Sequence, residues 1–457
     1  MQNGLVDELA AFAVGLQYED IPEDVRSTAS DALGDFAAVA VPGARSELGK
    51  LALAYLNSRS RSGRCVLFGT QSKMDSVSAG FFNATASHAL DFDDTASSSQ
   101  GHPTVCIAPA VFAVAQETSA NGKDLIRAYV AGLEVMHQIA RWSMPQTGRN
   151  GWHTTPVFGP FGAVAATANL RSESQSVTAD ALAAAASRSG GLRVNFGTGT
   201  KAFHAGFAVS SAMECLELAS YGLTGSRQVF EGTDGFLQCF ASRNVKEIPV
   251  CRLGTYWDLR EKGLDFKLYP CCSGSHPAID AVLDFLKETP ISPGDVESIH
   301  CGVSLLSPKE LVCHSPQNAL EAKFSMEYAL ASAFIYGGVS LLEFTDSKVQ
   351  APEVQDFMRK VSISVDDELA KLGFIGYAPV KIAIRTKDGQ EFFLRRMKAR
   401  GRKETPFSIA EKKAKFSGCM NAAGIPSKLA GLWWEQLTHI EDLGPGDIAQ
   451  IGFTSIQ

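Results

Sequence analysis

The chain has 457 residues, of which 45% are hydrophobic and 20% are charged, an ordinary composition for a globular protein. This length exceeds the size at which single hydrophobic cores stop growing, so two domains are expected. The formal net charge of −7 argues against the basic surface that binds nucleic acid or anionic membranes. No apolar run approaches the ~20 residues of a membrane-spanning helix.

The ten cysteines form no recognisable framework, because only Cys271 and Cys272 are adjacent and no C-x-x-C motif occurs. Zinc-ribbon and typical iron–sulfur spacings are therefore absent. The first residues, MQNGLVDELA, are typical of neither a signal peptide nor a transit peptide, so we expect a cytoplasmic protein with reduced thiols. The glycines form no phosphate-binding loop or dinucleotide-binding turn, which argues against a nucleotide cofactor.

The first part of the chain, up to about residue 262, predicts one helix after another. Asp20 and Pro22 precede an Ala/Val-rich helix at 23–41, which is expected to end at Pro42-Gly43. Further Ala-rich helices are predicted at 105–117, 123–142, 160–170, 178–189 and 204–221. Small side chains let helices approach closely, so we expect a tightly packed domain whose loops carry the polar motifs.

The pattern changes after about residue 263, where alternating apolar residues predict strands at 296–304, 361–365, 380–385 and 391–395. Lys387-Asp388-Gly389, between the last two strands, is typical of a hairpin turn. Helices are predicted at 276–287, 324–336, 408–423 and 426–437. We therefore expect a mostly α-helical large domain from residues 1–262 and 406–457. A smaller α+β domain, residues 263–405, is inserted before the C-terminal helices.

Polar residues inside small or apolar stretches are the main functional signal. They lie in five segments: HALDFDDT (88–95), GHPT (101–104), GWHTT (151–155), GTKAFHAG (199–206) and FKLYPCC (266–272). Histidines, lysines and a carboxylate in such places can move a proton at a carbon next to carboxylate groups. The combination favours a cofactor-free lyase or isomerase of small organic acids.

Asp91, Asp93 and Asp94 have two interpretations. They could bind Mg²⁺, with Asp91 and Thr95 on one face of a helix, but no second acidic motif has a suitable spacing. Alternatively, one or two of the aspartates cap a helix or a turn. We expect no metal here, and capping suits Asp93 and Asp94 better than Asp91.

His102 and His153 each precede a small-residue helix, in a loop bounded by Gly or Pro. A lone histidine is commonly structural. Two in the same kind of loop favour acid–base catalysis, because imidazole titrates near neutral pH. His204 and His276 have weaker claims, and His88 fits a packing role.

Lys201 and Lys267 each stand alone among small or apolar residues, whereas solvated lysines usually occur in mixed charged runs. A lysine ammonium can hold a substrate carboxylate and stabilise the negative charge that develops when a proton is abstracted. The alternative is a surface lysine whose stem covers apolar residues. Cys271 and Cys272 fit small core residues better than nucleophiles.

In chain order, HALDFDDT, GHPT, GWHTTPVFGPFG, GTKAFHAG, FKLYPCC and EAKFSMEY resemble the MmgE/PrpD family. That family includes 2-methylcitrate dehydratase, cis-aconitate decarboxylase and iminodisuccinate epimerase. The resemblance covers nearly the whole chain. It implies a helical domain from both ends of the chain, an inserted α+β domain and a homodimer. It also implies catalysis without a metal or an organic cofactor.

The resemblance also implies roles for individual residues. The catalytic residues would be His102, His153, Asp91 and Tyr328, and the substrate-binding residues would be Lys201, Lys267, Thr95, Cys272 and His276. Some members have a histidine five residues after the second lysine, where this chain has Cys272, and the nearest histidine is His276. The spacing from Thr95 to His102 is also one residue longer than in the decarboxylase. Both departures concern substrate fit and leave the reaction open.

Three functions are therefore considered. The first is a cofactor-independent lyase that dehydrates or decarboxylates a small di- or tricarboxylate, with lysines holding carboxylates and histidines exchanging the proton. The second is an epimerase of a dicarboxylate such as iminodisuccinate, which would use the same residues with one base on each face of an acidic carbon. The third is a catalytically silent binding protein.

Overall fold

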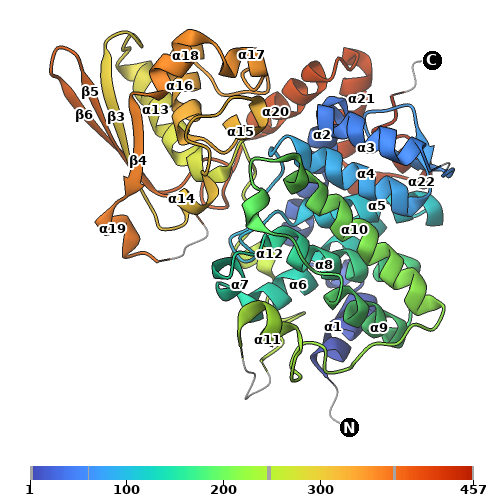
Figure 1. The fold of residues 1–457 in the computed structure, drawn as a ribbon. Helices are drawn as coiled ribbons and strands as arrows, with labels where there is room; N and C mark the ends of the chain where they lie inside the picture. The colour runs from blue at the N-terminus through green and yellow to red at the C-terminus, as the bar shows by residue number, and fades with distance from the viewer. Residues whose placement is uncertain (1–3, 60, 244–248, 374–376, 455–457) are drawn as a thin grey trace. The chain divides into compact units, whose positions relative to one another are not determined.

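The computed structural model describes residues 4–59, 61–243, 249–373 and 377–454 (Figure 1). The chain divides into two compact units. The first unit comprises Met1–Val194, Ala202–Leu264 and Cys419–Gln457, and the second comprises Asn195–Lys201 and Asp265–Gly418. The division expected from the sequence differs from this one in three segments, of which residues 263–264 group with the first unit. Residues 195–201, which include Lys201, and residues 406–418 group with the second unit.

Helices form most of the first unit. Their bounds are α1 Leu5–Gly15, η1 Tyr18–Asp20, α2 Glu23–Arg45, α3 Glu47–Asn57, α4 Ser76–Ala89, α5 Thr104–Thr118, α6 Gly122–Ser143, α7 Gln146–Arg149, α8 Thr154–Arg171, α9 Gln175–Ala186, η2 Arg193–Asn195, α10 Gly199–Ser220, α11 Phe236–Ala241, α12 Asp258–Glu261, α21 Ser427–Thr438, η4 Ile440–Asp442 and α22 Pro445–Ile448. One antiparallel pair of short strands, β1 Cys65–Val66 and β2 Lys73–Met74, interrupts them. The unit is therefore mostly, but not entirely, helical.

The end of α2 differs from the prediction, because the helix continues through Pro42 to Arg45. Proline removes one hydrogen bond from a helix interior. The last turn nevertheless packs tightly on α4, since a Cβ atom at Gly43 would lie 1.9 Å from the carbonyl oxygen of Ala86. This packing of the last turn against α4 offsets the lost hydrogen bond.

The centre of the first unit is formed by α4, α5 and α8, which are buried along almost their whole length. Helices that are buried on all sides are apolar or small-sided all round, as the Ala-rich sequence predicts. The largest shifts in helix starts are those of α8, which begins at Thr154 rather than at 160, and α10, which begins at Gly199 rather than at 204. His153 therefore directly precedes a helix, and Lys201 and His204 lie within α10 rather than in a loop.

The second unit combines helices with one sheet. Its elements are η3 Ser273–Ser275, α13 His276–Glu288, β3 Val296–Val303, α14 Ser307–Glu310, α15 Ala319–Ala322, α16 Met326–Tyr336, α17 Asp346–Val349, α18 Pro352–Met358, β4 Val361–Val365, α19 Asp367–Ala370, β5 Val380–Thr386, β6 Glu391–Arg396 and α20 Ile409–Ala422, which ends in the first unit. The strand order is β4-β3-β5-β6. The β3–β4 pair is parallel, and the β3–β5 and β5–β6 pairs are antiparallel. The four predicted strands and the β5–β6 hairpin are confirmed.

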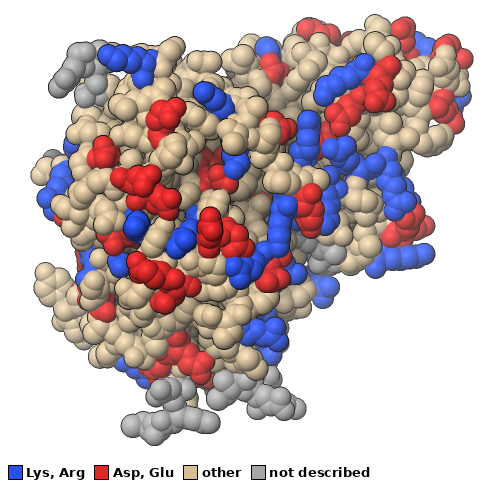
Figure 2. Space-filling model, turned by 180° about the vertical axis from the view of Figure 1, so that it is seen from behind, with Lys and Arg blue, Asp and Glu red and all other residues tan. Residues whose placement is uncertain are grey.

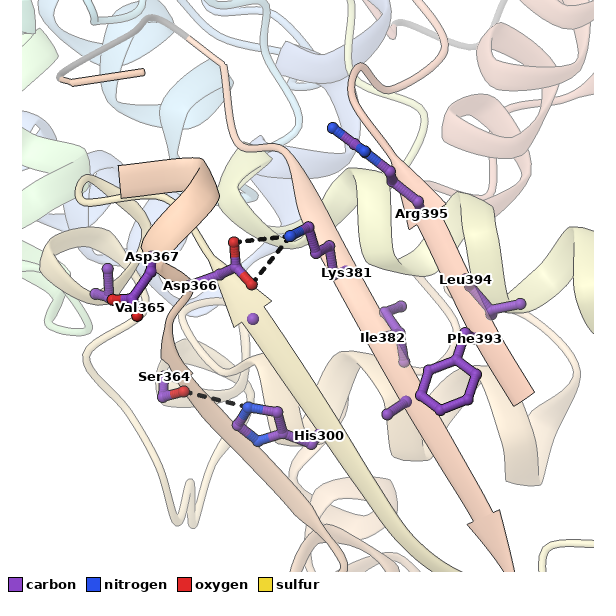
Figure 3. Close-up of a pocket in the computed structure, with 12 residues that line it drawn as sticks. His300, Ser364, Val365, Asp366, Asp367, Lys381, Ile382, Phe393, Leu394 and Arg395 are labelled. Atoms are coloured by element: carbon purple, nitrogen blue, oxygen red, sulfur yellow. Dashed lines mark hydrogen bonds and ion pairs between the residues drawn. The ribbon is translucent and has the colours of Figure 1, made fainter. Parts of the chain in front are cut away.

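One face of this sheet packs against α13 and α16, with Ile299, Cys301 and Ile382 in the core. The other face carries His300, Lys381 and Phe393. Figure 3 shows this face, where an open hollow of about 450 Å³ lies beside the ion pair of Lys381 and Asp366. The residues that line the hollow include none of the site residues proposed from the sequence.

Charged side chains of both signs are spread over the face shown in Figure 2. Within the described part of the chain, no helix combines the length and the apolar composition that crossing a membrane would require.

Candidate functional site

The loop between α4 and α5 carries three residues of the proposed site. Helix α4 ends at Ala89, Leu90 caps it, and Asp91 follows with a φ of 52°. Among residues other than glycine, Asp and Asn adopt this left-handed conformation most readily. The turn at Asp91 ends the helix, so the expectation that Asp91 and Thr95 share a helical face is wrong. Thr95 lies half-buried in the same loop.

The loop is closed by main-chain contacts before α5 begins. The N–H of Ala96 donates to the carbonyl of Gly101 at 2.9 Å. The N–H of His102 then donates to the hydroxyl of Thr155 in the first turn of α8, also at 2.9 Å. The early start of α8, which the sequence did not predict, thus fixes the backbone position of His102.

Asp93 is the centre of the site, although the sequence favoured a capping role for it. Its Oδ2 lies 2.7 Å from Nδ1 of His102 and 2.9 Å from Nδ1 of His88. Burial raises the pKa of Asp93, but the charges and hydrogen bonds of the two histidines outweigh it and hold the pKa well below its usual range. Asp93 is therefore an ionised carboxylate shared by two imidazoles.

His102 also has a carboxylate on the other side of its ring, since its Nε2 lies 3.9 Å from Oδ1 of Asp91. Its side chain is 11% exposed, whereas those of His88 and Asp93 are at most 1% exposed. His102 is thus the member of this group that a small molecule can reach. This arrangement agrees with the acid–base role proposed from the sequence.

His153 pairs with His204 rather than with a carboxylate, and their Nδ1 atoms lie 2.9 Å apart. One nitrogen must donate and the other accept, so the two rings share one proton and take complementary tautomers. The ring of His88 lies 4.5 Å from that of His102, edge to face, and 5.9 Å from that of His153, stacked. We call this group the histidine cluster: His88, His102, His153 and His204 with Asp91 and Asp93.

Asp94 points elsewhere and partly fulfils the capping interpretation. Its carboxyl accepts hydrogen bonds from the hydroxyl and the backbone N–H of Thr104, the first residue of α5. The same hydroxyl lies 2.7 Å from that of Tyr129. Burial, which is the largest influence, raises the pKa of Asp94 to about 8. Asp94 is therefore mostly protonated at neutral pH and ties the start of α5 to the loop.

Four members of the cluster could supply metal ligands by type: His88, Asp91, Asp93 and His102 have ligand atoms within 4.8 Å of one another. The two nitrogen–oxygen distances at Asp93, 2.7 and 2.9 Å, are hydrogen-bond lengths. Two ligands of a tetrahedral zinc ion, each bound at about 2.0–2.1 Å, lie roughly 3.3 Å apart. The arrangement as it stands suits proton sharing, and a metal would require the imidazoles to move away from Asp93.

The proposed lysines lie in the second unit, and both are buried. The ammonium of Lys201 lies 5.5 Å from the ring centre of Phe196 and 5.2 Å from that of Phe324, within the range of cation–π attraction. Lys267 is only 2% exposed. The alternative that these are surface lysines is therefore wrong.

A third buried lysine, Lys323, was not chosen from the sequence. Its ammonium donates to the carbonyl of Pro270 at 3.0 Å and lies over the ring of Phe344, and its own carbonyl accepts the N–H of Cys272. It satisfies the criterion applied to Lys201, since Lys323 stands alone between Ala322 and Phe324. Asp93 and His88 were also missed, because their pairing depends on the loop and not on spacing.

The remaining proposed residues lie in the core of the second unit. Tyr328 donates its hydroxyl hydrogen to the carbonyl of Glu343, and burial raises the pKa of Tyr328 above its usual value. His276 has its Nε2 3.1 Å from the carbonyl oxygen of Cys271. The sulfur of Cys272 lies 4.0 Å from a carboxylate oxygen of Glu310. These contacts give each residue a protein partner in addition to any role toward substrate.

Comparisons with known proteins agree with this organisation. Residues 7–248 match the MmgE/PrpD N-terminal domain and residues 269–428 match the MmgE/PrpD C-terminal domain. The chain is 27% identical to the cis-aconitate decarboxylase of Homo sapiens over 354 residues, which cover 74% of this chain and 71% of the relative. It is 28% identical to the cis-aconitate decarboxylase of Aspergillus terreus over 404 residues, which cover 81% and 80%.

Proposed function

The chain belongs to the MmgE/PrpD family, and from this premise we propose that it is a lyase of a small di- or tricarboxylate. Decarboxylation of a cis-aconitate-like acid is the preferred reaction, because curated relatives carry that name. Dehydration of a 2-methylcitrate-like acid is the variant of the same chemistry. His102 and His153 exchange the proton, and Lys201 and Lys267 bind carboxylates.

The observation that carries the proposal is the placement of His102 between two carboxylates, with its ring partly open to solvent. Loss of CO₂ leaves an electron pair on carbon, and that carbon must receive a proton. Imidazolium is a suitable acid for this step near neutral pH. Asp91, 3.9 Å from Nε2 of His102, orients that nitrogen and stabilises its protonated form. No step needs a metal or an organic cofactor.

Epimerisation of a dicarboxylate such as iminodisuccinate is the second candidate. It is favoured by one feature of the cluster: His102 and His153 have separate hydrogen-bonding partners, Asp93 and His204. Each can therefore hold or release a proton through its own partner, as two bases on opposite faces of one carbon require.

The test is incubation of the purified protein in D₂O with cis-aconitate, 2-methylcitrate, citrate and iminodisuccinate, followed by NMR. Loss of CO₂ with one deuterium incorporated into the product supports the decarboxylase, and loss of water supports the dehydratase. Inversion with incorporation of deuterium, and without loss of CO₂ or water, supports the epimerase. Absence of any turnover or exchange would favour the catalytically silent binding protein.

The carboxylate-binding role has its own test in Lys201→Gln and Lys267→Gln. Both changes should raise KM and lower kcat together, because the same contacts hold ground-state carboxylates and developing charge. Lys381→Gln is a matched control, since that lysine lies on the open sheet face and pairs with Asp366. Wild-type KM and kcat in either buried-lysine variant would remove that lysine from the mechanism.

A homodimer is part of the proposal, as the family resemblance implies. Light scattering coupled to size exclusion should give about twice the chain mass of 48.8 kDa. A mass of one chain at assay concentration would contradict it.

A further inference from the structure

We propose that Asp93 and His88 are positioning residues, which together fix the tautomer of His102 and limit how many protons the histidine cluster holds. The proposal rests on the proposed function only in treating His102 as the group that exchanges the proton. Neither Asp93 nor His88 needs to touch the substrate. Both act through the ring of His102, which is the more open side chain.

The first step concerns the tautomer. An ionised carboxylate only accepts hydrogen bonds, so both nitrogens that face Oδ2 of Asp93 must carry hydrogen. Neutral His102 is therefore protonated at Nδ1, with its lone pair on Nε2. That second nitrogen lies on the side of Asp91. Proton exchange is thus directed to one defined atom, Nε2 of His102.

The second step concerns His88. Its Nδ1–H occupies the same carboxylate oxygen as that of His102, so the charge of Asp93 is divided between two rings. The ring of His88 also lies against those of His102 and His153. Two neighbouring imidazolium ions in buried surroundings repel each other strongly. We infer that neutral His88 keeps Asp93 from stabilising a second positive charge and that the cluster gains protons one at a time.

The surroundings support this division of charge. Among the described residues, the other titratable groups that interact with Asp93 or Asp94 include Cys106 of α5, Asp35 of α2 and Tyr129 of α6, the last two through Asp94. Burial raises the pKa of the Cys106 thiol far above neutral, and that of Asp94 to about 8. Both are mostly uncharged at neutral pH, so the charge of Asp93 acts chiefly on the histidines.

The tautomer can be tested without a substrate. In protein with ¹⁵N-labelled histidine, His102 should appear as the Nδ1–H tautomer at pH values at which its imidazole is neutral. The His102 signal is assigned by its absence from the spectrum of His102→Gln. In Asp93→Ala no side-chain acceptor remains for either ring, so the Nε2–H tautomer should appear for at least one of them. Finding neutral His102 as the Nε2–H tautomer in the wild-type protein would overturn the proposal, whatever the reaction proves to be.

Kinetics supply the second test, through the alkaline limb of the kcat profile, on which His102 loses the proton that it donates as general acid. Asp93→Asn removes the charge that stabilises imidazolium, so the limb should move to lower pH and kcat should fall by about 10²-fold or more, as when a catalytic histidine loses its carboxylate partner. His88→Leu removes the second hydrogen-bond donor to Asp93, so the whole charge of Asp93 acts on His102. Its limb should move to higher pH, with kcat within about tenfold of wild type.

His137→Gln is the matched control, because it removes a buried histidine that faces a different aspartate, Asp258, at 3.3 Å. Its pH profile should coincide with that of the wild type. Shifts of the Asp93 and His88 variants in the same direction, or no shift in either, would contradict the proposal. If one variant does not fold, the ¹⁵N spectra of the wild-type protein still decide the tautomer.

Discussion

Buried histidines face aspartates at two places in the described part of the first unit, around Asp93 and around Asp258, and the surroundings of the two places differ. Asp93 has its charge balanced by His102 and His88. Asp258 faces His137 at 3.3 Å, but it also forms an ion pair with Arg141 at 2.5 Å and accepts a hydrogen bond from the hydroxyl of Ser98 at 2.7 Å.

The difference lies in whether the partner can lose its proton. Arginine stays charged at any accessible pH, so Asp258 is neutralised permanently. Burial alone would raise the pKa of Asp258, but its partners hold that pKa well below the usual value. Imidazole releases its proton near neutral pH, so the charge balance at Asp93 can change during a reaction. A buried aspartate indicates proton chemistry when its partners titrate, and a structural role when they do not.

Removal of the histidines at each place tests this distinction most directly. His102→Ala and His153→Ala should each lower turnover by about 10²–10⁴-fold, the usual loss for a general acid or base. His137→Ala should leave turnover within a few-fold of wild type. Steady-state rates, with circular dichroism as the check on folding, measure this. Near-normal turnover in both site variants would move the proton chemistry elsewhere.

Loss of stability should be larger when Asp258 is changed than when Asp93 is changed, although loss of turnover should be larger at the site of Asp93. Asp258→Asn leaves the guanidinium of Arg141 without its anion, and breaking a buried ion pair costs roughly 3–5 kcal/mol. The lower end applies here, because the Arg141 side chain is 22% exposed. Asp93→Asn should cost less free energy of unfolding, since an imidazolium at His102 can lose its proton when the carboxylate is removed. Urea unfolding of both variants gives the ranking, and the reverse order would refute the distinction.

Asp94 offers a smaller effect that depends on pH. Its pKa of about 8 in the folded protein exceeds the ordinary value of 3.8 for an aspartate, so the folded state binds more protons between these two values. Its contribution to stability therefore decreases as pH rises from about 4 to 8. Asp94→Asn mimics the protonated form and should gain stability relative to wild type over that interval, by at most about 1.4 kcal/mol per pH unit. A difference that is constant from pH 4 to 8 would exclude the raised pKa.

The smallest expected effect is that of a chelator. Activity should survive dialysis against EDTA, because the cluster's nitrogen–oxygen distances of 2.7 and 2.9 Å suit shared protons. Loss of activity that Zn²⁺ or Mg²⁺ restores would show that His88, Asp93 and His102 separate to hold an ion. In that case the difference between Asp93 and Asp258 could not be explained by the titration of their partners alone.

Periodicity in the sequence was enough to predict much of the fold. Alternation of apolar residues predicted all four strands of the larger sheet, and Lys387-Asp388-Gly389 predicted the hairpin between β5 and β6. The starts of α8 and α10 were missed, because Thr154-Thr155-Pro156 and Gly199-Thr200 are typical of loops. Both segments form first turns of helices, where proline and polar residues are tolerated.

The candidate site was predicted less completely, for a physical reason. His102, His153, Lys201 and Lys267 could be chosen from their local surroundings, and all four are buried. The pairing of Asp93 with His88 and His102 arises from the turn at Asp91 and from the closure of the loop on α8. Neither leaves a periodic pattern in the sequence, so His88 was assigned to packing and Asp93 to capping.

The left-handed backbone at Asp91 has a consequence for engineering. A residue other than glycine strains the chain at a φ of 52°, whereas glycine adopts it freely. Asp91→Gly should therefore relieve that strain, even as it removes the carboxylate beside His102. Selection of variants for thermal tolerance alone would accept this substitution at the expense of turnover. At this position robustness and catalysis make opposite demands on one residue, as they often do in active sites.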